Sequence, residues 1–352
     1  MKVLVSIIIP VYNASSFLVQ RLECLQKQTL SELEIICIDD GSTDNSAEMI
    51  KSIADHDTRV KLIQQNKSNA GVARNIGLKY AVGEYIYFAD ADDFCERNFI
   101  EKMYIKALST KSDIVLCTCK DYNTKNGTYS DHWNLLNEKI SEKIEVFSKE
   151  NFTNGFFNII TPEVWLRLYR REFILKNNIN FQSLSNTNDL YFSYMTMALA
   201  NRISFIRDKL CYYRVNNASS IQQTKYKDPL CICKAFLSVY DELNRLGLYS
   251  GLERSYVEAT AENFAWNIRT IRNDKALIML YIELIANIIP KTNLTGYPIE
   301  YYSNKADYEL LKQIPINLKE MYDKILNEKA SLISISTVRK IKKYIYKFLK
   351  IK

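Results

Sequence analysis

Runs of consecutive apolar residues alternate with helical patterns through the first third of the chain. Runs of strand length occur at residues 5–12, 34–39, 60–65, 85–90 and 113–119. Strands without polar alternation are typical of a parallel sheet that helices cover on both faces. Between the first and second runs, Leu18, Leu22 and Leu25 recur at helical spacing. Between the second and third runs, the segment 42–54 begins with helix-capping residues. This order predicts an α/β fold with a doubly wound, mostly parallel sheet.

The pattern changes after the fifth run. Residues 121–150 are polar and irregular, and residues 151–221 mix short helical stretches with strand-like pieces. From about residue 226 onward the apolar spacing is helical throughout. We therefore predict a first domain over 1–222, with halves meeting near residue 120, and a mainly α-helical C-terminal region over 223–352.

Polar clusters follow three of the predicted strands, at Pro10–Asn13, Asp39–Asp44 and Asp90–Asp93. The carboxyl ends of the strands in such a sheet are where ligands bind. Carboxylates gathered there need a counter-charge, and Mn²⁺ or Mg²⁺, which prefer oxygen ligands and keep open positions for phosphates, would supply it. The cluster predicts a nucleoside diphosphate held through a metal. The sequence contains no GxxxxGK[ST] motif and no GxGxxG after the first strand, which argues against a P-loop NTPase or a dinucleotide dehydrogenase.

Four strings in this region carry a family resemblance. "SIIIPVYN", "IICIDDGSTDNS", "NAGVARNIGL" and "YIYFADADDF" follow one another over residues 6–94. In this order and spacing they resemble the inverting family 2 glycosyltransferases, which have the GT-A nucleotide-sugar fold. Later stretches at 164–174, 187–192 and 203–221 are similar to the same family. The resemblance covers about residues 3–222 and implies a catalytic GT-A domain, with a nucleotide-sugar half (about 1–120) and an acceptor half (about 121–222).

The resemblance implies a pocket for the nucleotide base at the ends of the first two strands. Pro10 and Tyr12 would line this pocket, and Asn13 would belong to the same nucleotide-sugar site. Asp40 would accept a hydrogen bond from N3–H of uracil. A carboxylate is a strong acceptor for such a donor, which also supports this role on chemical grounds.

The resemblance also implies a site for the ribose and the diphosphate. Arg74 and Asn75 would lie near the nucleotide, and Asp90 would contact the ribose. Ala91 would lie in the same nucleotide-sugar site, and Asp92 would bind the divalent cation, Mn²⁺ or Mg²⁺, that bridges the diphosphate. A metal ion lowers the free-energy cost of the negative charge that develops on the departing diphosphate.

An inverting transfer also needs a general base, because the acceptor hydroxyl loses its proton as it attacks. In the family the base is usually the Asp of a Glu-Asp pair at the start of a helix. The matching residues here are Asn188 and Asp189. The resemblance therefore implies Asp189 as the base, while Asn188 departs from the usual Glu and leaves acceptor recognition open.

The sequence allows two interpretations for several residues near these motifs. Asp93 is either a further metal ligand or a helix cap, and Arg214 either faces the diphosphate or is a solvated strand residue. Trp165 is either a platform for the acceptor or a buried aromatic residue. Asp39 and Asp44 are expected to cap a helix or close a turn.

The C-terminal segment 336–352 has the pattern of a basic amphipathic helix. One helical face carries Val338, Ile341, Ile345, Phe348 and Leu349, and six Lys and Arg residues cover the rest. The seven Lys and Arg residues of 330–352 equal the whole net charge of +7, so the rest of the chain is near neutral, which argues against a nucleic-acid surface. The segment is typical of a helix that binds an anionic membrane surface. The alternative is a helix that packs on its own domain.

The remaining features concern location. The eight cysteines form no CxxC pair, and the opening "VLVSIIIPVY" is interrupted by Pro10. We interpret the cysteines as reduced thiols and the opening segment as a buried strand. No apolar run is long enough to span a bilayer. The sequence thus predicts a cytoplasmic protein, peripheral at the inner face of the cell membrane.

The predicted function is metal-assisted, inverting transfer of a sugar from a UDP-sugar to a saccharide or lipid-linked saccharide. Its expected setting is the synthesis of bacterial surface polysaccharide or glycolipid. One alternative, which Asn188 favours, is a non-catalytic protein of the same fold that binds sugar nucleotides or serves as a scaffold. Another is a nucleotidyltransferase, although "PVYNASSF" lacks the Gly-rich, Lys-containing stretch of that class.

Overall fold

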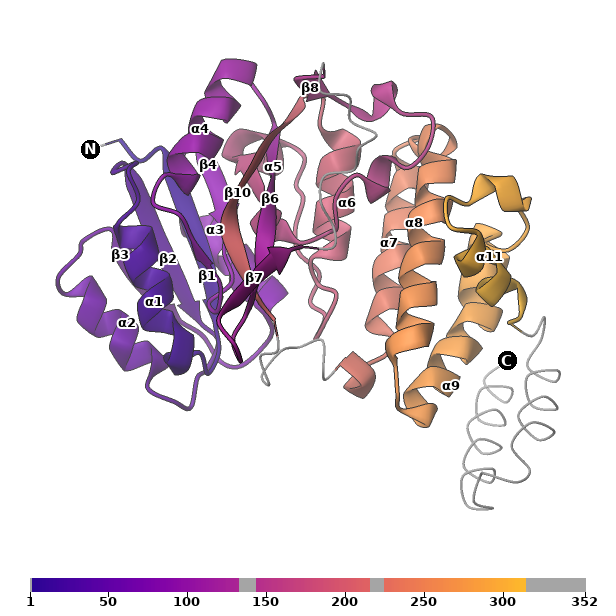
Figure 1. The fold of residues 1–352 in the computed structure, drawn as a ribbon, viewed down its shortest axis with the longest axis horizontal. Helices are drawn as coiled ribbons and strands as arrows, with labels where there is room; N and C mark the ends of the chain where they lie inside the picture. Colours follow the sequence, from indigo (N-terminus) through magenta and orange to yellow (C-terminus); the bar gives the residue numbers. More distant parts are fainter. Residues whose placement is uncertain (1, 133–143, 216–224, 315–352) are drawn as a thin grey trace. The chain divides into compact units, whose positions relative to one another are not determined.

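The computed structural model describes residues 2–132, 144–215 and 225–314. The chain forms two compact units, 1–220 and 221–352 (Figure 1). This division lies close to the predicted boundary after residue 222, while the assignment of catalysis to the first unit remains a prediction. The predicted amphipathic helix over 336–352 lies outside the described residues.

The first unit is built on one ten-stranded sheet. Its parallel part follows the order β3 (Val60–Gln64), β2 (Leu33–Asp39), β1 (Val5–Val11) and β4 (Tyr85–Phe88). The sheet continues with β9 (Arg167–Arg170), β6 (Ile114–Asn123), β10 (Ile203–Val215) and β5 (Phe94–Cys95). This second part is mixed, because β9 runs antiparallel to both β4 and β6, and β5 runs antiparallel to β10. Two short strands, β7 (Thr128–Asp131) and β8 (Val146–Phe147), pair with β6 and β10 in antiparallel fashion.

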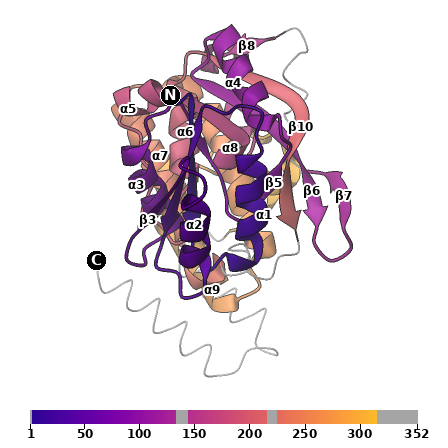
Figure 2. The same ribbon diagram turned by 90° about the vertical axis from the view of Figure 1, so that its left-hand side faces the viewer.

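Helices cover both faces of the parallel part, as the uninterrupted apolar strands predict. The first helices are α1 (Ser15–Gln26), α2 (Ser46–Ala54), α3 (Ala70–Tyr80) and α4 (Phe99–Thr110). Helices α1 and α3 lie on opposite sides of the strands (Figure 2), as right-handed crossovers require when the chain reverses direction across the sheet. Helix α3 lies very close to β1, because a Cβ at Gly77 would be 2.3 Å from Cγ2 of Ile8.

The acceptor half adds short elements around an aromatic core. Its described residues, 121–132 and 144–215, include the 3₁₀ turns η1 (Lys149–Asn151), η2 (Phe156–Asn158) and η3 (Val164–Leu166) and the helices α5 (Arg171–Lys176) and α6 (Leu190–Leu199). The rings of Phe181 and Phe192 stack with centroids 4.0 Å apart, and Phe88 of β4 packs edge-on against both. This cluster fixes the start of α6 near the end of β4.

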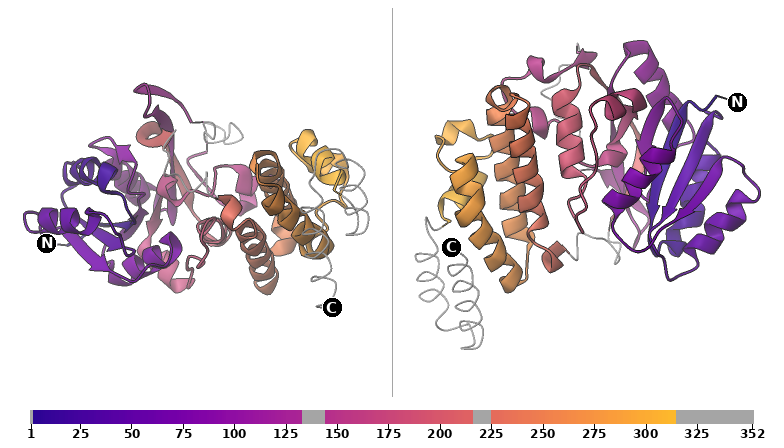
Figure 3. Two further views of the ribbon diagram at one scale, coloured as in Figure 1. Left: turned by 90° about the horizontal axis from the view of Figure 1, so that it is seen from below. Right: turned by 180° about the vertical axis from the view of Figure 1, so that it is seen from behind.

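The second unit is helical. It contains η5 (Lys225–Lys227), α7 (Cys231–Arg245), α8 (Tyr249–Thr270), α9 (Asp274–Glu283), the π-helical turn η6 (Leu284–Ile288), α10 (Ile289–Thr292), η7 (Ile299–Tyr301) and α11 (Lys305–Lys312). Helices α7 and α8 run side by side (Figure 3), and Phe236 and Tyr256 pack between them. Residues 225–314 contain no strand, in agreement with the helical spacing of the sequence. None of the described helices is long and apolar enough to cross a bilayer.

Candidate active site

The three polar clusters lie next to one another at the carboxyl ends of β1, β2 and β4. In the parallel register, Val11 is opposite Asp39, and Ile8 is opposite Phe88. The chain continues the pairing beyond the strands, since Asp40 N donates to Val11 O and Ala89 N donates to Ile8 O. The sheet therefore brings residues from three distant segments to one edge, as the sequence predicts.

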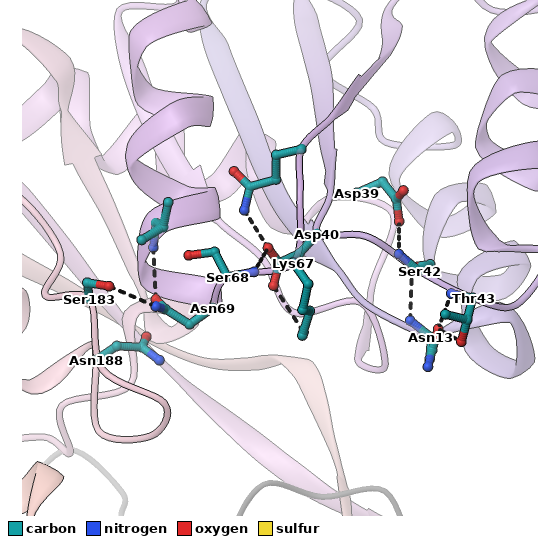
Figure 4. Close-up of polar contacts among 12 residues, drawn as sticks. Asn13, Asp39, Asp40, Ser42, Thr43, Lys67, Ser68, Asn69, Ser183 and Asn188 are labelled. Atoms are coloured by element: carbon teal, nitrogen blue, oxygen red, sulfur yellow. Dashed lines mark hydrogen bonds and ion pairs between the residues drawn. The ribbon is translucent and has the colours of Figure 1, made fainter.

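Asp40 lies at the centre of a dense set of hydrogen bonds (Figure 4). Its Oδ1 accepts from Gln65 Nε2 at 2.5 Å and from Ser68 N at 2.8 Å, and its Oδ2 accepts from Lys67 Nζ at 3.0 Å. The same ammonium lies 3.0 Å from the centre of the Tyr12 ring. Tyr12 is 47% exposed, while Asp40 is 2% exposed. Lys67 thus occupies the space between the two side chains that the resemblance assigns to the base.

Asn13 closes the next turn of the same edge. Its Oδ1 accepts from Thr43 N at 2.8 Å, and its backbone N donates to Ser42 Oγ at 3.0 Å (Figure 4). Asp39 and Asp44 have the expected capping roles. Asp39 Oδ1 accepts from Ser42 N, and Asp44 accepts from the N–H groups that begin α1 and α2. These bonds lower the pKa of Asp44 to about 2 even though burial opposes them. Pro10 lies within β1, in register with Ile38 of β2.

Arg74 connects the donor and acceptor halves of the site. From α3, its Nη2 reaches Asp90 Oδ1 at 2.7 Å and its Nη1 donates to Asn188 Oδ1 at 2.8 Å. Both Arg74 and Asn188 are 6% exposed. Gly71 permits this approach, because a Cβ at that position would lie 2.3 Å from Gln182 O and 3.1 Å from Cβ of Asn188. One guanidinium therefore joins the carboxylate cluster after β4 to the segment that carries Asp189.

The loop before α6 is docked on α3 by further amide pairs. The Asn75 side chain both donates to Phe181 O at 2.9 Å and accepts from Phe181 N at 2.8 Å. Asn69, which caps α3, also donates to Ser183 Oγ at 3.0 Å (Figure 4). Asn75 thus joins two chain segments, and its place near the nucleotide remains a prediction. Thr187 has a φ of +56°, which is strained for a β-branched residue, at the turn that leads into α6.

Asp189 is the residue at the start of α6. Its backbone oxygen accepts from Ser193 N at 2.9 Å, but its side chain makes no capping hydrogen bond to the described helix. Burial raises the pKa of Asp189, Arg74 and Arg167 lower it, and Asp90 raises it further. A carboxylate near two cations that is not engaged as a helix cap remains available to a substrate.

Asp90, Ala91, Asp92 and Asp93 lie in the turn between β4 and β5. Burial, Asp92 and Asp90 raise the pKa of Asp93 well above its usual value. No described residue donates a hydrogen bond to the buried Oδ2 of Asp93. Clustered carboxylate oxygens that repel one another are chemically suited to Mn²⁺ or Mg²⁺. Within residues 2–132, 144–215 and 225–314, no three His, Cys, Asp or Glu side chains form a group that could hold a metal ion by themselves.

Arg214 holds this turn from β10. Its backbone N donates to Asp93 Oδ1 at 3.0 Å, its Nε donates to Asp92 O, and its Nη2 donates to Gln20 Oε1. Arg214 is 8% exposed and also lies 4.8 Å from the centre of the Phe94 ring. The side chain is thus buried against the carboxylate turn, and the solvated-strand interpretation does not hold.

Trp165 belongs to the core of the acceptor half. It is 4% exposed, and its ring stacks on Tyr213 with centroids 5.4 Å apart and an interplanar angle of 13°. Its position agrees with the alternative of a buried aromatic residue. A role as an acceptor platform remains a prediction.

Sequence reasoning missed three charged residues of this site: Lys67, Glu163 and Arg167. Lys67 lies between the apolar run 60–65 and the family string 69–78, and nothing in its spacing shows that it reaches Tyr12. Arg167 is fully buried and donates to Ser193 O and Thr161 O. Burial raises the pKa of Glu163 to about 8, and Asp189 and Asp90 add to the effect. Glu163 directly precedes η3 and Arg167 begins β9, so the tertiary fold, and not their place in the sequence, puts their charges near Asp189.

Comparison with known proteins gives the family. The model of glycosyl transferase family 2 matches residues 6–176. Glycosyltransferase GlyG of Streptococcus pneumoniae is 32% identical over 234 residues, which are 64% of this chain and 75% of GlyG. The chain belongs to glycosyl transferase family 2. Membership in this family makes it a glycosyltransferase and confirms the predicted resemblance.

Solved structures share the fold of this family 2 glycosyltransferase. Residues 1–349 of TarS of Staphylococcus aureus in complex with UDP-GlcNAc align with a TM-score of 0.54 and 20% identity, over 91% of this chain and 98% of that one. The mannosyltransferase PcManGT of Pyrobaculum calidifontis, in complex with GDP-Man and Mn²⁺, aligns with a TM-score of 0.50 and 15% identity, over 92% and 88% of the two chains. These similarities confirm the predicted α/β GT-A fold.

Proposed function

We propose that this family 2 glycosyltransferase transfers a sugar with inversion, from a UDP-sugar to a saccharide or lipid-linked saccharide, with the help of a divalent cation. The catalytic domain would be residues 1–222. The observation that carries the proposal is the position of Arg74, which is bonded to Asp90 at 2.7 Å and to Asn188 at 2.8 Å. A donor site at Asp90 and a base at Asp189 would then lie on either side of one guanidinium.

A uridine nucleotide fits the chemistry of the pocket at Tyr12 and Asp40. The half-exposed Tyr12 ring offers a face for stacking, and the Asp40 carboxylate offers an acceptor for an N–H donor. TarS, which shares the fold, binds UDP-GlcNAc. The ammonium of Lys67 would have to leave this space when the base enters, because it lies between the same two groups.

Asp189 would act as the general base in a single in-line displacement. Its carboxylate takes the proton of the acceptor hydroxyl as the hydroxyl oxygen bonds to the anomeric carbon and the bond to the diphosphate oxygen breaks. Arg74 and Arg167 favour the ionised form of Asp189 against the effect of burial. Asp92 would hold Mn²⁺ or Mg²⁺, and the charge of the cation would supply stabilisation for the leaving diphosphate. Asp93 is a candidate for a second carboxylate ligand.

The proposed setting is the synthesis of bacterial surface polysaccharide or glycolipid at the inner face of the cell membrane. Two observations support it. The relatives TarS and GlyG are bacterial glycosyltransferases, and TarS is a poly(ribitol-phosphate) β-N-acetylglucosaminyltransferase. The basic amphipathic pattern of 336–352 suits an enzyme whose acceptor is carried by a lipid.

A donor screen tests the proposal. The full-length protein is incubated with a panel of UDP-sugars and, for comparison, GDP-mannose, each with Mn²⁺, with Mg²⁺ and with a chelator, and release of the nucleoside diphosphate is measured. We expect release from at least one UDP-sugar that the chelator abolishes. The matched control is Asp208→Asn, an exposed residue paired with Lys102, which should behave as wild type. UDP binding without release from any donor, with saccharide acceptors present, would favour the non-catalytic alternative.

A further inference from the structure

Two cysteines of the first unit lie close together. Cys24 of α1 and Cys95 of β5 have their Sγ atoms 3.6 Å apart. Cys24 is the partly exposed member of the eight free cysteines, and the other seven are buried. The fully buried guanidinium of Arg21 lies 4.0 Å from one sulfur and 3.9 Å from the other. The hydrogen bond from Cys95 and the charge of Arg21 lower the pKa of Cys24 to about 6 although burial opposes them.

We infer that Cys24 and Cys95 are an oxidation site that closes into an intramolecular disulfide. The Cys24 thiolate attacks a hydroperoxide, which gives a sulfenic acid and releases water or an alcohol. The Cys95 sulfur then displaces the hydroxyl, so that an S–S bond forms, a second water leaves and the peroxide has taken up two electrons. A disulfide needs the sulfurs about 1.5 Å closer, at a bond length of about 2 Å. The bond would tie α1 to the strand that follows the carboxylate turn.

Peptide mapping without reductant tests this site. The protein is treated with one equivalent of hydrogen peroxide and digested, and cross-linked peptides are identified by mass. We expect a Cys24–Cys95 cross-link that dithiothreitol reverses and that is absent in Cys24→Ser and in Cys95→Ser. Cys37→Ser is the matched control, because burial raises the pKa of that thiol to about 12 and its loss should not change the cross-link. Oxidation of Cys24 to sulfinic acid without a link, or no reaction at Cys24, would refute the inference.

Discussion

The ammonium of Lys67 lies 3.0 Å from Oδ2 of Asp40 and 3.0 Å from the centre of the Tyr12 ring. These are the two groups proposed to hold the uracil base, and the positive charge of Lys67 lies between them. A base that enters the proposed site would therefore have to break one ion pair and one cation–π contact.

We expect Lys67→Met to bind UDP more tightly. A half-exposed ion pair is worth about 0–1 kcal/mol, and an exposed cation–π contact about 0.5–1 kcal/mol. Removing both from the unbound state should raise the affinity roughly two- to thirtyfold, since about 1.4 kcal/mol corresponds to a factor of ten. Titration calorimetry with UDP measures the change. Asp40 stays hydrogen-bonded in the variant through Gln65 and Ser68.

Lys61→Met is the matched control for this experiment. Lys61 is 49% exposed and pairs with the buried Glu34 at 2.7 Å, which resembles the pair of Lys67 with Asp40. Its loss should leave UDP affinity unchanged. A weaker affinity in Lys67→Met would mean that the ammonium moves onto the nucleotide and contributes to binding, which contradicts the competition described here.

Asp92→Asn should abolish the metal dependence of UDP binding. The substitution keeps the shape of the side chain and removes the charge that a divalent cation needs. In wild type, calorimetry should show tighter UDP binding with Mn²⁺ than with a chelator, and in Asp92→Asn the two affinities should coincide. A wild-type affinity that does not depend on metal would remove the proposed role of Asp92.

Asp189→Asn should lower the transfer rate by roughly a hundredfold or more, the usual effect of a positioned base. UDP affinity should not change, since the proposed nucleotide contacts lie on other segments. The measurement is kcat for the donor and acceptor found by screening, together with UDP calorimetry. Near wild-type transfer by the variant would assign the base to another carboxylate.

Asn188→Asp should shift the acid limb of the kcat profile to higher pH. The new carboxylate has the same shape as the amide and would face Arg74 Nη1 at the position where Asn188 Oδ1 lies at 2.8 Å. It would share the guanidinium charge with Asp90 and add an anion beside Asp189. A like charge favours the protonated form, so the pKa of Asp189 should rise. The control is Asn180→Asp, at an exposed position, which should leave the profile unchanged. An unshifted profile in Asn188→Asp would show that a charge at position 188 does not affect the base.

Asp40 and Asp90 could be placed from the sequence because each directly follows an uninterrupted apolar strand, and parallel strands end at one edge. The four-stranded parallel part of the sheet follows from the same rule. The antiparallel strand β9 and the partners of Arg74 could not be derived, because they depend on how the acceptor half folds back. Glu163 has no local signal at all, because its neighbour Pro162 meets Ser193, which is 31 residues further along the chain. Arg214 shows the same limit, because only its burial in the fold excludes the solvated alternative.

Deletion of 336–352 should release the protein from anionic vesicles. This segment lies outside the described residues, so the prediction comes from the sequence. Its apolar face can bury hydrocarbon at the headgroup boundary, and its Lys and Arg residues add on the order of 1 kcal/mol each near an anionic leaflet. High salt should weaken attachment of the full chain, because charges are screened within about 8 Å at physiological ionic strength. Co-sedimentation with anionic and with neutral vesicles measures binding, and UDP calorimetry on the truncated chain controls for folding. Equal co-sedimentation of full-length and truncated protein would favour the alternative in which this helix packs on its own domain.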